Sequence, residues 1–188
     1  ALGRWRAVGF SINGKGYVGT GRPFNASLLN LKDMWEYDPV TNSWLQKADM
    51  PTTGGRVDAF VFLFNNKAYI GSGAYDNSMF EFDPSVGTIG AWSPKASYPG
   101  EANNLVAAFA TNLAGFAGTG GKSNDGSFYK KDFWRYSPST NSWTKKTDFP
   151  GFPRYSAIAF SINGIGYMGL GYNHNPRANM RDIYKYVQ

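Results

Sequence analysis

Three arginines at regular spacing are the residues in this sequence best suited to binding chemistry. Arg4, Arg56 and Arg154 each stand thirteen residues before a tyrosine. A guanidinium group donates hydrogen bonds through a planar fork, so a ring of such groups could capture a carboxylate or a sulfate. The alternative is that each guanidinium bonds loop carbonyls or carboxylates and thereby orients a turn. Asn103 holds the corresponding position in a further copy and interrupts the series.

A second set of candidates lies in four segments of varied sequence, 22–32, 74–77, 121–131 and 172–181. Aromatic rings edged by amides and charges suit sugars or extended peptides. Such residues also fill ordinary turns, which is the competing interpretation. The candidate ligand-binding residues are Arg22, Phe24, Asn25, Tyr75, Asp76, Asn77, Lys122, Asn124, Asp125, Tyr129, Tyr172, Asn173, His174 and Arg177.

Few residues could carry catalysis or hold a metal. His174 is the single histidine and cysteine is absent, which excludes disulfides and thiol chemistry. A Ser-His-Asp triad would depend on His174, and no serine lies in a nucleophile-elbow sequence. The segment Ser123–Ser127 offers oxygen donors but lacks the length and the closing glutamate of a calcium loop. We therefore predict no catalytic residues, no cofactor and no metal.

Composition restricts the class of protein further. The chain has 188 residues, of which 42% are apolar and 17% aromatic, and a net charge of +6. The basic residues are scattered in runs of at most two, so a nucleic-acid partner is not expected. No apolar window of membrane-spanning length exists, and we do not expect the residues ALGRWRAVGF at the start of the sequence to act as a signal peptide, since they lack a long apolar stretch and a cleavage site.

The elements that must position the candidates follow from an internal repeat. Phe10–Gly21, FSINGKGYVGTG, recurs as Phe160–Gly171, FSINGIGYMGLG, with nine of twelve residues identical. A second block, DMWEYDPVTNSWLQKADMP from Asp33, recurs as DFWRYSPSTNSWTKKTDFP from Asp132. Two further copies bring the total to four, and the last one ends at its third strand.

Each copy predicts four antiparallel strands. The first strand is an apolar run, and an Asn-Gly pair in two copies predicts a tight hairpin into the second. The third strand leads through an Asp-Pro-x-Thr-Asn turn to an outer strand that contains a tryptophan. We expect the first strands at Ala7–Ile12, Ala59–Phe64, Val106–Asn112 and Ala157–Ile162. We expect six repeated rings to pack one copy against the next, namely Tyr17, Tyr69, Tyr167, Trp44, Trp92 and Trp143.

Four-stranded units of about fifty residues predict an all-β propeller. The motifs quoted above resemble kelch repeats. The segment YDPVTNSWLQKADMP in particular is similar to kelch repeats in secreted and cell-surface bacterial proteins. The resemblance covers residues 1–188 and implies blades at about 4–51, 52–99, 100–150 and 151–188, the last incomplete. Only Ala1–Gly3 precede the first arginine, too few to supply the absent strand, which favours a segment of a larger propeller. A four-bladed ring or an assembly of two chains are the alternatives.

Several enzymes have propellers of kelch repeats, and the resemblance implies that their catalytic residues can be looked for in this sequence. The copper oxidases of this fold need two histidines and a Tyr–Cys link, which this sequence cannot supply. The iron-dependent specifier proteins use a Glu-xxx-Asp-xxx-Asp triplet, which is absent, and the sialic-acid mutarotases need Glu and His partners beside their channel arginines.

The sequence thus favours a non-catalytic module, outside the cytoplasm, that presents a loop face to a protein, a peptide or a glycan. The alternatives are part of a carbohydrate-active enzyme whose catalytic residues lie in other blades, and a structural component of a cell-surface or secretion assembly.

Overall fold

The computed structural model describes residues 2–25, 29–74, 76–101, 104–121, 129–175 and 177–187. All regular elements within these ranges are β-strands, most of them four or five residues long. No part of the chain that the structure describes forms a helix long and apolar enough to cross a membrane.

Four antiparallel sheets repeat along the chain, and we number them as blades. Blade 1 contains β2 (Val8–Ile12), β3 (Lys15–Gly19), β5 (Met34–Asp38) and β6 (Ser43–Lys47). Blade 2 contains β7 (Phe60–Phe64), β8 (Lys67–Gly71), β9 (Met79–Asp83) and β10 (Ala91–Lys95). Blade 3 contains β11 (Ala107–Ala110), β12 (Gly115–Gly118), β13 (Phe133–Ser137) and β14 (Ser142–Lys146). Blade 4 has the three strands β15 (Ile158–Ile162), β16 (Ile165–Gly169) and β19 (Ile183–Tyr186).

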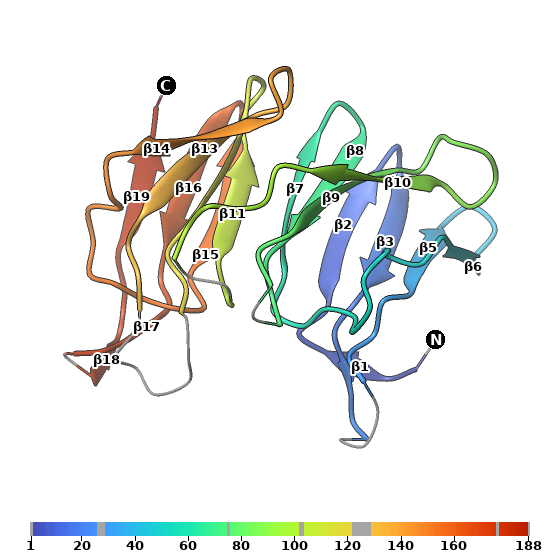
Figure 1. Cartoon of the computed structure of the whole chain (residues 1–188), viewed down its shortest axis with the longest axis horizontal. Helices are drawn as coiled ribbons and strands as arrows, with labels where there is room; N and C mark the ends of the chain where they lie inside the picture. The colour runs from blue at the N-terminus through green and yellow to red at the C-terminus, as the bar shows by residue number, and fades with distance from the viewer. Residues whose placement is uncertain are drawn as a thin grey trace.

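Two shorter strand pairs include segments that the sequence predicted to be loops. β1 (Arg4–Trp5) pairs with β4 (Arg22–Pro23), and β17 (Tyr172–His174) pairs with β18 (Arg177–Asn179). The segments predicted to be loops are β4, β17 and β18. Both pairs lie at the lower side of the molecule in Figure 1. This side is the loop face on which the candidate residues were expected.

The hairpins between first and second strands form because their turn residues accept a left-handed backbone. Asn13 and Gly14 have φ angles of 51° and 77°, and Asn163 and Gly164 have angles of 51° and 75°. Two consecutive residues of positive φ match the twist of a two-residue hairpin. The predicted Asn-Gly hairpins are therefore present. The first strands of the blades, β2, β7, β11 and β15, each begin one residue later than expected.

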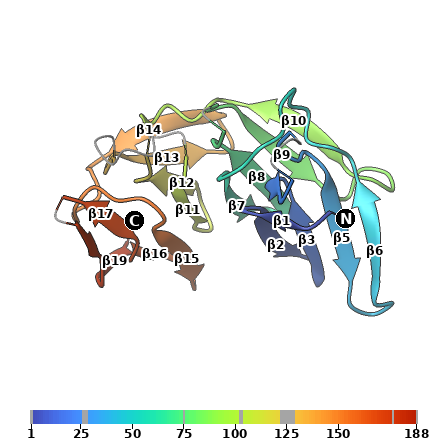
Figure 2. The same cartoon turned by 90° about the horizontal axis from the view of Figure 1, so that it is seen from below.

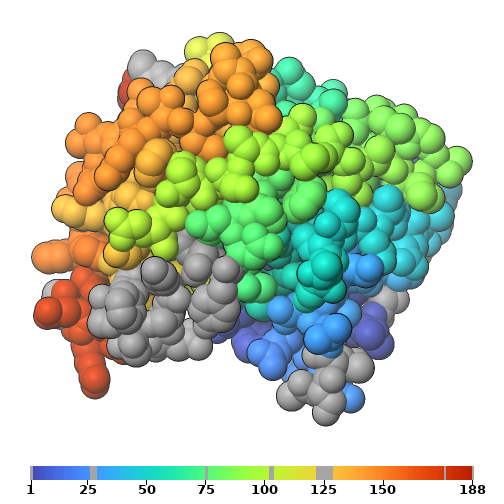
Figure 3. Space-filling model, in the orientation of Figure 1, coloured from blue at the N-terminus to red at the C-terminus, as the bar shows by residue number. Residues whose placement is uncertain are grey.

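The four blades follow one another around an arc (Figure 2), with β2, β7, β11 and β15 towards its inner side and the outer strands on its convex side. Seen in space-filling form, the blades pass from blue to red across one continuous surface (Figure 3). The predicted all-β propeller, with blades of four antiparallel strands and an incomplete last blade, is confirmed.

In blades 1 to 3 a stacked pair of rings on the first two strands contacts the next blade. The ring centroids are 5.1 Å apart in Phe10–Tyr17, 5.2 Å in Phe62–Tyr69 and 5.1 Å in Phe109–Phe116. The next blade covers each pair, since Tyr17 contacts Phe82, Tyr69 contacts Tyr136 and Phe116 contacts Tyr186. Full burial of a ring stabilises the stack by about 1.5–3 kcal/mol, and every ring of these pairs except the half-buried Phe10 is buried.

Two of the six predicted packing rings depart from this pattern. Trp92 and Trp143 pack against the preceding blade, whereas Trp44 is 54% exposed. Tyr167 is only half-buried, and its stacking partner Phe160 is 38% exposed. The physical reason is position, because Trp44 belongs to the first described blade and Tyr167 to the last. Within the described residues no blade packs on those two faces.

Candidate functional site

The three arginines of the predicted series are bound to protein groups. Arg4 forms a bidentate pair with Asp33, at 2.6 and 2.7 Å, and Arg154 bonds both carboxylate oxygens of Asp182. Arg154 is fully buried, and it also donates to the carbonyl of Leu170. The hydrogen bond from Arg154 lowers the pKa of the Asp182 carboxyl below its usual value.

Arg56 occupies the same place in blade 2. It is buried, pairs with Asp76 at 2.8 Å, and donates to the carbonyls of Gly73 and Asp76 at 3.1 Å each. All three guanidinium groups therefore bind the chain that leads from the second strand to the third. This geometry is the one expected of the turn-orienting alternative rather than of an open anion-binding ring.

The blade 1 candidates lie in β4 or directly after it. Arg22 lies directly opposite Trp5 in the β1–β4 pair, and the Arg6 guanidinium lies 4.6 Å from the centre of the Trp5 ring. Phe24 is 85% exposed, and Asn25 is exposed next to it. Trp5 was not among the predicted site residues, although it directly follows an arginine of the series. This group is accessible, but its rings do not form a cluster with one another.

The blade 2 candidates hold their own loop together. The Asp76 carboxylate binds Arg56 and accepts a hydrogen bond from the Ser78 amide at 2.7 Å. Asn77 donates to the carbonyl of Gly100 at 3.1 Å and so ties this loop to the link into blade 3. Tyr75 lies outside the described residues, as do Lys122, Asn124 and Asp125 of blade 3.

The structure brings three of the remaining candidates together with one unpredicted residue. The ring centroids of Tyr129 and Tyr155 are 4.6 Å apart, and those of Tyr129 and His174 are 5.4 Å apart. Tyr172 lies 5.7 Å from Tyr155 and 5.2 Å from His174 in edge-on geometry. All four rings are half-buried. We call Tyr129, Tyr155, Tyr172 and His174 the loop-face cluster.

Backbone pairing holds the loop-face cluster in place. Tyr155 bridges to Tyr172, with amide-to-carbonyl distances of 3.0 and 3.1 Å, and Tyr129 bridges to Gly121. The side chain of Asn173 is buried and forms two hydrogen bonds of 3.0 Å with the backbone of Asn175. These bonds fix the β17–β18 hairpin, which presents His174 and the exposed Arg177 opposite each other. The cluster thus offers flat aromatic faces edged by three tyrosine hydroxyls and an imidazole, and the cation of Arg177 lies on the strand opposite His174.

Sequence reasoning missed Tyr155, although a signal for it was present. Tyr155 directly follows Arg154, as Trp5 directly follows Arg4, so an aromatic residue occupies the same repeat position in two blades. Since that position lies beside the second-to-third-strand loop, its side chain joins the loop residues on one face.

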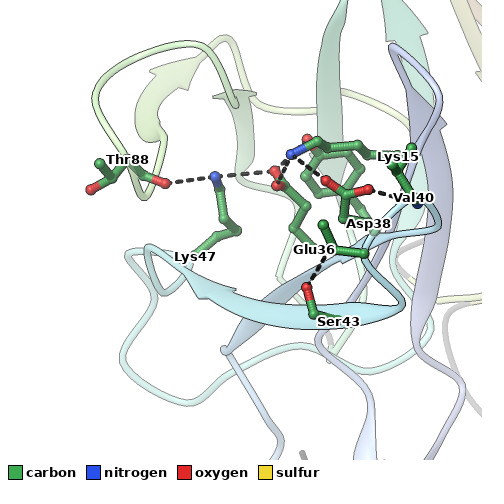
Figure 4. A network of polar contacts seen from close by, with 9 residues as sticks. Lys15, Glu36, Asp38, Val40, Ser43, Lys47 and Thr88 are labelled. Carbon is green, nitrogen blue, oxygen red and sulfur yellow. Dashed lines mark hydrogen bonds and ion pairs between the residues drawn. The ribbon is translucent and has the colours of Figure 1, made fainter.

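A cleft of about 670 Å³ lies on the opposite side, where the hairpin turns of blades 1 and 2 meet. Its charged groups bind one another (Figure 4): Glu36 accepts from Lys15 at 2.8 Å and from the Tyr17 hydroxyl at 2.7 Å. Lys47 lies 3.1 Å from Glu36 and donates to the Thr88 carbonyl at 2.7 Å.

Blade 2 repeats this arrangement around Glu81, which binds Tyr69, Lys67 and Lys95. The network therefore recurs at the same place in two blades and links three strands within each blade, and in blade 1 Lys47 also bonds the next blade through Thr88. Within the described ranges, no group of three or more His, Asp or Glu side chains could hold a metal ion.

Comparison with solved structures identifies the fold. Structural neighbours number 172 chains, among them one described as "Structure of YjhT". That match has a TM-score of 0.78 at 18% sequence identity and covers 97% of this chain and 68% of the other. The protein is a β-propeller. At this sequence identity the likeness concerns the fold alone. Searches with family models and against curated proteins find no match.

Proposed function

We propose that this propeller is a non-catalytic binding module, outside the cytoplasm, and that its loop-face cluster binds a glycan. The observation that carries the proposal is the convergence of Tyr129, Tyr155, Tyr172 and His174 from three separate segments. Half-buried rings offer apolar area for the faces of sugar rings, and their edges offer hydrogen-bonding groups for hydroxyls. Extended peptide is the alternative ligand, since peptide bonds also stack on aromatic faces.

The scaffold supports this assignment because the site lies on short elements that a rigid stack of blades positions. The ion pair of buried Arg154 with Asp182 and the Tyr155–Tyr172 bridge hold the backbone of two of the four rings in place before any ligand arrives. A preformed site loses little conformational entropy when it binds. The resemblance to kelch repeats of secreted and cell-surface proteins is what supports a location outside the cytoplasm.

The first test is a glycan array followed by calorimetry with the best ligand. Tyr172→Ala should reduce affinity at least about tenfold, since a stacking ring contributes about 1 kcal/mol or more beyond its burial. Tyr172→Phe should retain most of the affinity because the ring face remains. Phe24→Ala is the matched control, as it removes an exposed ring from the same face but from blade 1.

Two outcomes would contradict the proposal. If Phe24→Ala abolishes binding while Tyr172→Ala does not, the ligand binds to blade 1. If the glycan is recovered chemically altered after incubation, the module is an enzyme rather than a binding protein. Near-ultraviolet circular dichroism of each variant checks that the aromatic packing of the fold is unchanged.

A further inference from the structure

The strand register of the β17–β18 hairpin determines which side chains lie next to the rings of the loop-face cluster. Tyr172 lies opposite Asn179, and His174 lies opposite Arg177. Residues that face each other across an antiparallel pair project to the same side, and so do residues two apart on one strand. These four side chains therefore share one face of the hairpin.

This face is the one turned towards the rest of the cluster. Its two rings both contact Tyr155, with centroid distances of 5.7 Å for Tyr172 and 6.5 Å for His174. The opposite face is turned inwards, since the side chain of Asn173 is buried there. Arg177 is exposed on the same face as the rings, so it extends the aromatic surface with a cation.

Two other cations adjoin cluster tyrosines in the sequence, and both are bound to carboxylates. Buried Arg154 binds both carboxylate oxygens of Asp182, and the ammonium group of Lys130 binds Glu101. Arg177 differs from them, because no carboxylate among the described residues forms an ion pair with it. The cluster therefore has one positive charge that the described part of the chain does not balance.

The chemistry of this surface has two parts. The planar fork of a guanidinium group matches the paired oxygens of a carboxylate or a sulfate. The tyrosine faces beside it offer flat apolar area to a sugar ring. A ligand that uses both parts at once is a sugar that carries an anionic group.

We propose that the loop-face cluster selects an acidic glycan, in which a sugar ring stacks on the tyrosines and its carboxylate or sulfate group pairs with Arg177. The proposal rests on the glycan-binding function proposed above and adds the charge of the ligand. Asn179 offers an exposed amide on the same face for a sugar hydroxyl. The net charge of +6 attracts an anionic polymer to the molecule before it reaches the site.

Rigidity favours an acidic glycan over an acidic peptide. A uronic acid presents its carboxylate and its ring face as one rigid group, so both contacts form without further ordering of the ligand. A peptide must order a flexible Asp or Glu side chain as well as its backbone, which costs conformational entropy. A neutral glycan would stack on the same rings but would gain no affinity from Arg177.

The test compares glycans that differ only in charge, first on the array and then by calorimetry. An oligogalacturonate and its methyl ester measure the contribution of a carboxylate, and cello-oligosaccharides with and without sulfate esters measure that of a sulfate. The charged member of at least one pair should bind about tenfold or more tightly. Raising the salt concentration from about 0.1 M to about 1 M should reduce this preference, because an exposed ion pair is screened.

Variants of the chain locate the charge that is responsible. Arg177→Gln should weaken binding of the acidic glycan about tenfold and leave binding of its neutral partner unchanged. Arg177→Lys should restore only part of the affinity, because an ammonium group lacks the planar fork. Arg22→Gln is the matched control, since it removes one exposed positive charge from the same side of the molecule, but in β4, and should keep the preference.

The outcomes separate this inference from the function on which it rests. Equal affinity for charged and neutral glycans, with binding still lost in Tyr172→Ala, would overturn the inference and leave the glycan site in place. Absence of binding to every glycan would overturn both. An equal loss in Arg22→Gln and Arg177→Gln would also overturn the inference, because the effect would then come from overall charge. Binding of poly-glutamate as tightly as of the acidic glycan would assign the site to an acidic peptide instead.

Discussion

Glu36 provides the most quantitative test of how the blades are held together. Its carboxylate is buried between blades 1 and 2 and binds Tyr17, Lys15 and Lys47 (Figure 4). Burial by itself would raise the pKa of this carboxyl, but the hydrogen bonds from Lys15, Tyr17 and Lys47 outweigh burial and lower the pKa from 4.5 to about 2. The Glu36→Gln variant removes the charge and keeps the shape.

The size of the effect follows from this shift in pKa. Because the folded-state pKa lies below the unfolded one, the charged form stabilises the fold above pH 4.5 and this stabilisation is lost as pH falls towards 2. A difference of about 2.5 pKa units corresponds to about 3.4 kcal/mol at pH 7, and linkage reduces it to about 1.4 kcal/mol at pH 3. Glu36→Gln resembles the protonated wild type, so the two proteins should converge in stability near pH 2.

Urea unfolding followed by tryptophan fluorescence measures this difference at pH 7, 4.5 and 3. Glu81→Gln in blade 2 should also destabilise the fold at pH 7. Burial alone would raise the pKa of the Glu81 carboxyl, but hydrogen bonds from Tyr69 and from two lysines lower it below its usual value. Glu101→Gln is the control, since its exposed carboxylate should contribute less than about 0.5 kcal/mol. A loss for Glu36→Gln that is small at pH 7, or that does not decrease towards pH 3, would refute the reasoning.

Three further substitutions test the packing of the blades, each by urea unfolding. Arg154→Met leaves the partly buried Asp182 carboxylate without its ion-pair partner and should lower the free energy of unfolding by about 2–4 kcal/mol at pH 7. This loss should decrease below pH 4, where Asp182 becomes protonated. An equal loss at pH 3 would contradict the role of the charge. Trp143→Ala should cost about 3–5 kcal/mol, whereas Trp44→Ala, which removes a half-exposed ring, should cost less than about 1 kcal/mol; equal costs would mean that Trp44 is also packed. Gly166→Ala should destabilise by about 1–3 kcal/mol because a Cβ would overlap the Phe109 ring of blade 3, and Gly54→Ala, where a Cβ meets nothing within 4 Å, should be close to neutral.

Much of the fold could be predicted from the sequence because each blade is a local unit. The Asn-Gly hairpins and the Asp-Pro-x-Thr-Asn turns lie between strands that are neighbours in both sequence and space. The strands of one blade therefore bury their alternating apolar residues against a sheet assembled from about fifty consecutive residues. The two short pairs β1–β4 and β17–β18 were missed because no apolar alternation marks strands of two or three residues.

The candidate site could be predicted only in part. Tyr129, Tyr172 and His174 were identified by residue type, but the same argument also named Phe24 and Asp76, which lie elsewhere or bind their own loop. Residue type indicates what a side chain can contact and does not indicate which segments meet. Tyr155 joins the cluster through a backbone bridge to Tyr172. Tyr155 precedes the first strand of blade 4 and Tyr172 follows the second, so no local sequence pattern indicates that they pair.

The sequence by itself determined the number of blades and the strands of their sheets, because these depend on turn chemistry and on a repeated apolar pattern. The tertiary structure alone decided which repeated residues are covered. Trp44 and Trp143 occupy the same repeat position, yet one is 54% exposed and the other packs against Tyr98. Burial depends on whether another blade lies against the ring, and that is a property of the assembled arc rather than of any one repeat.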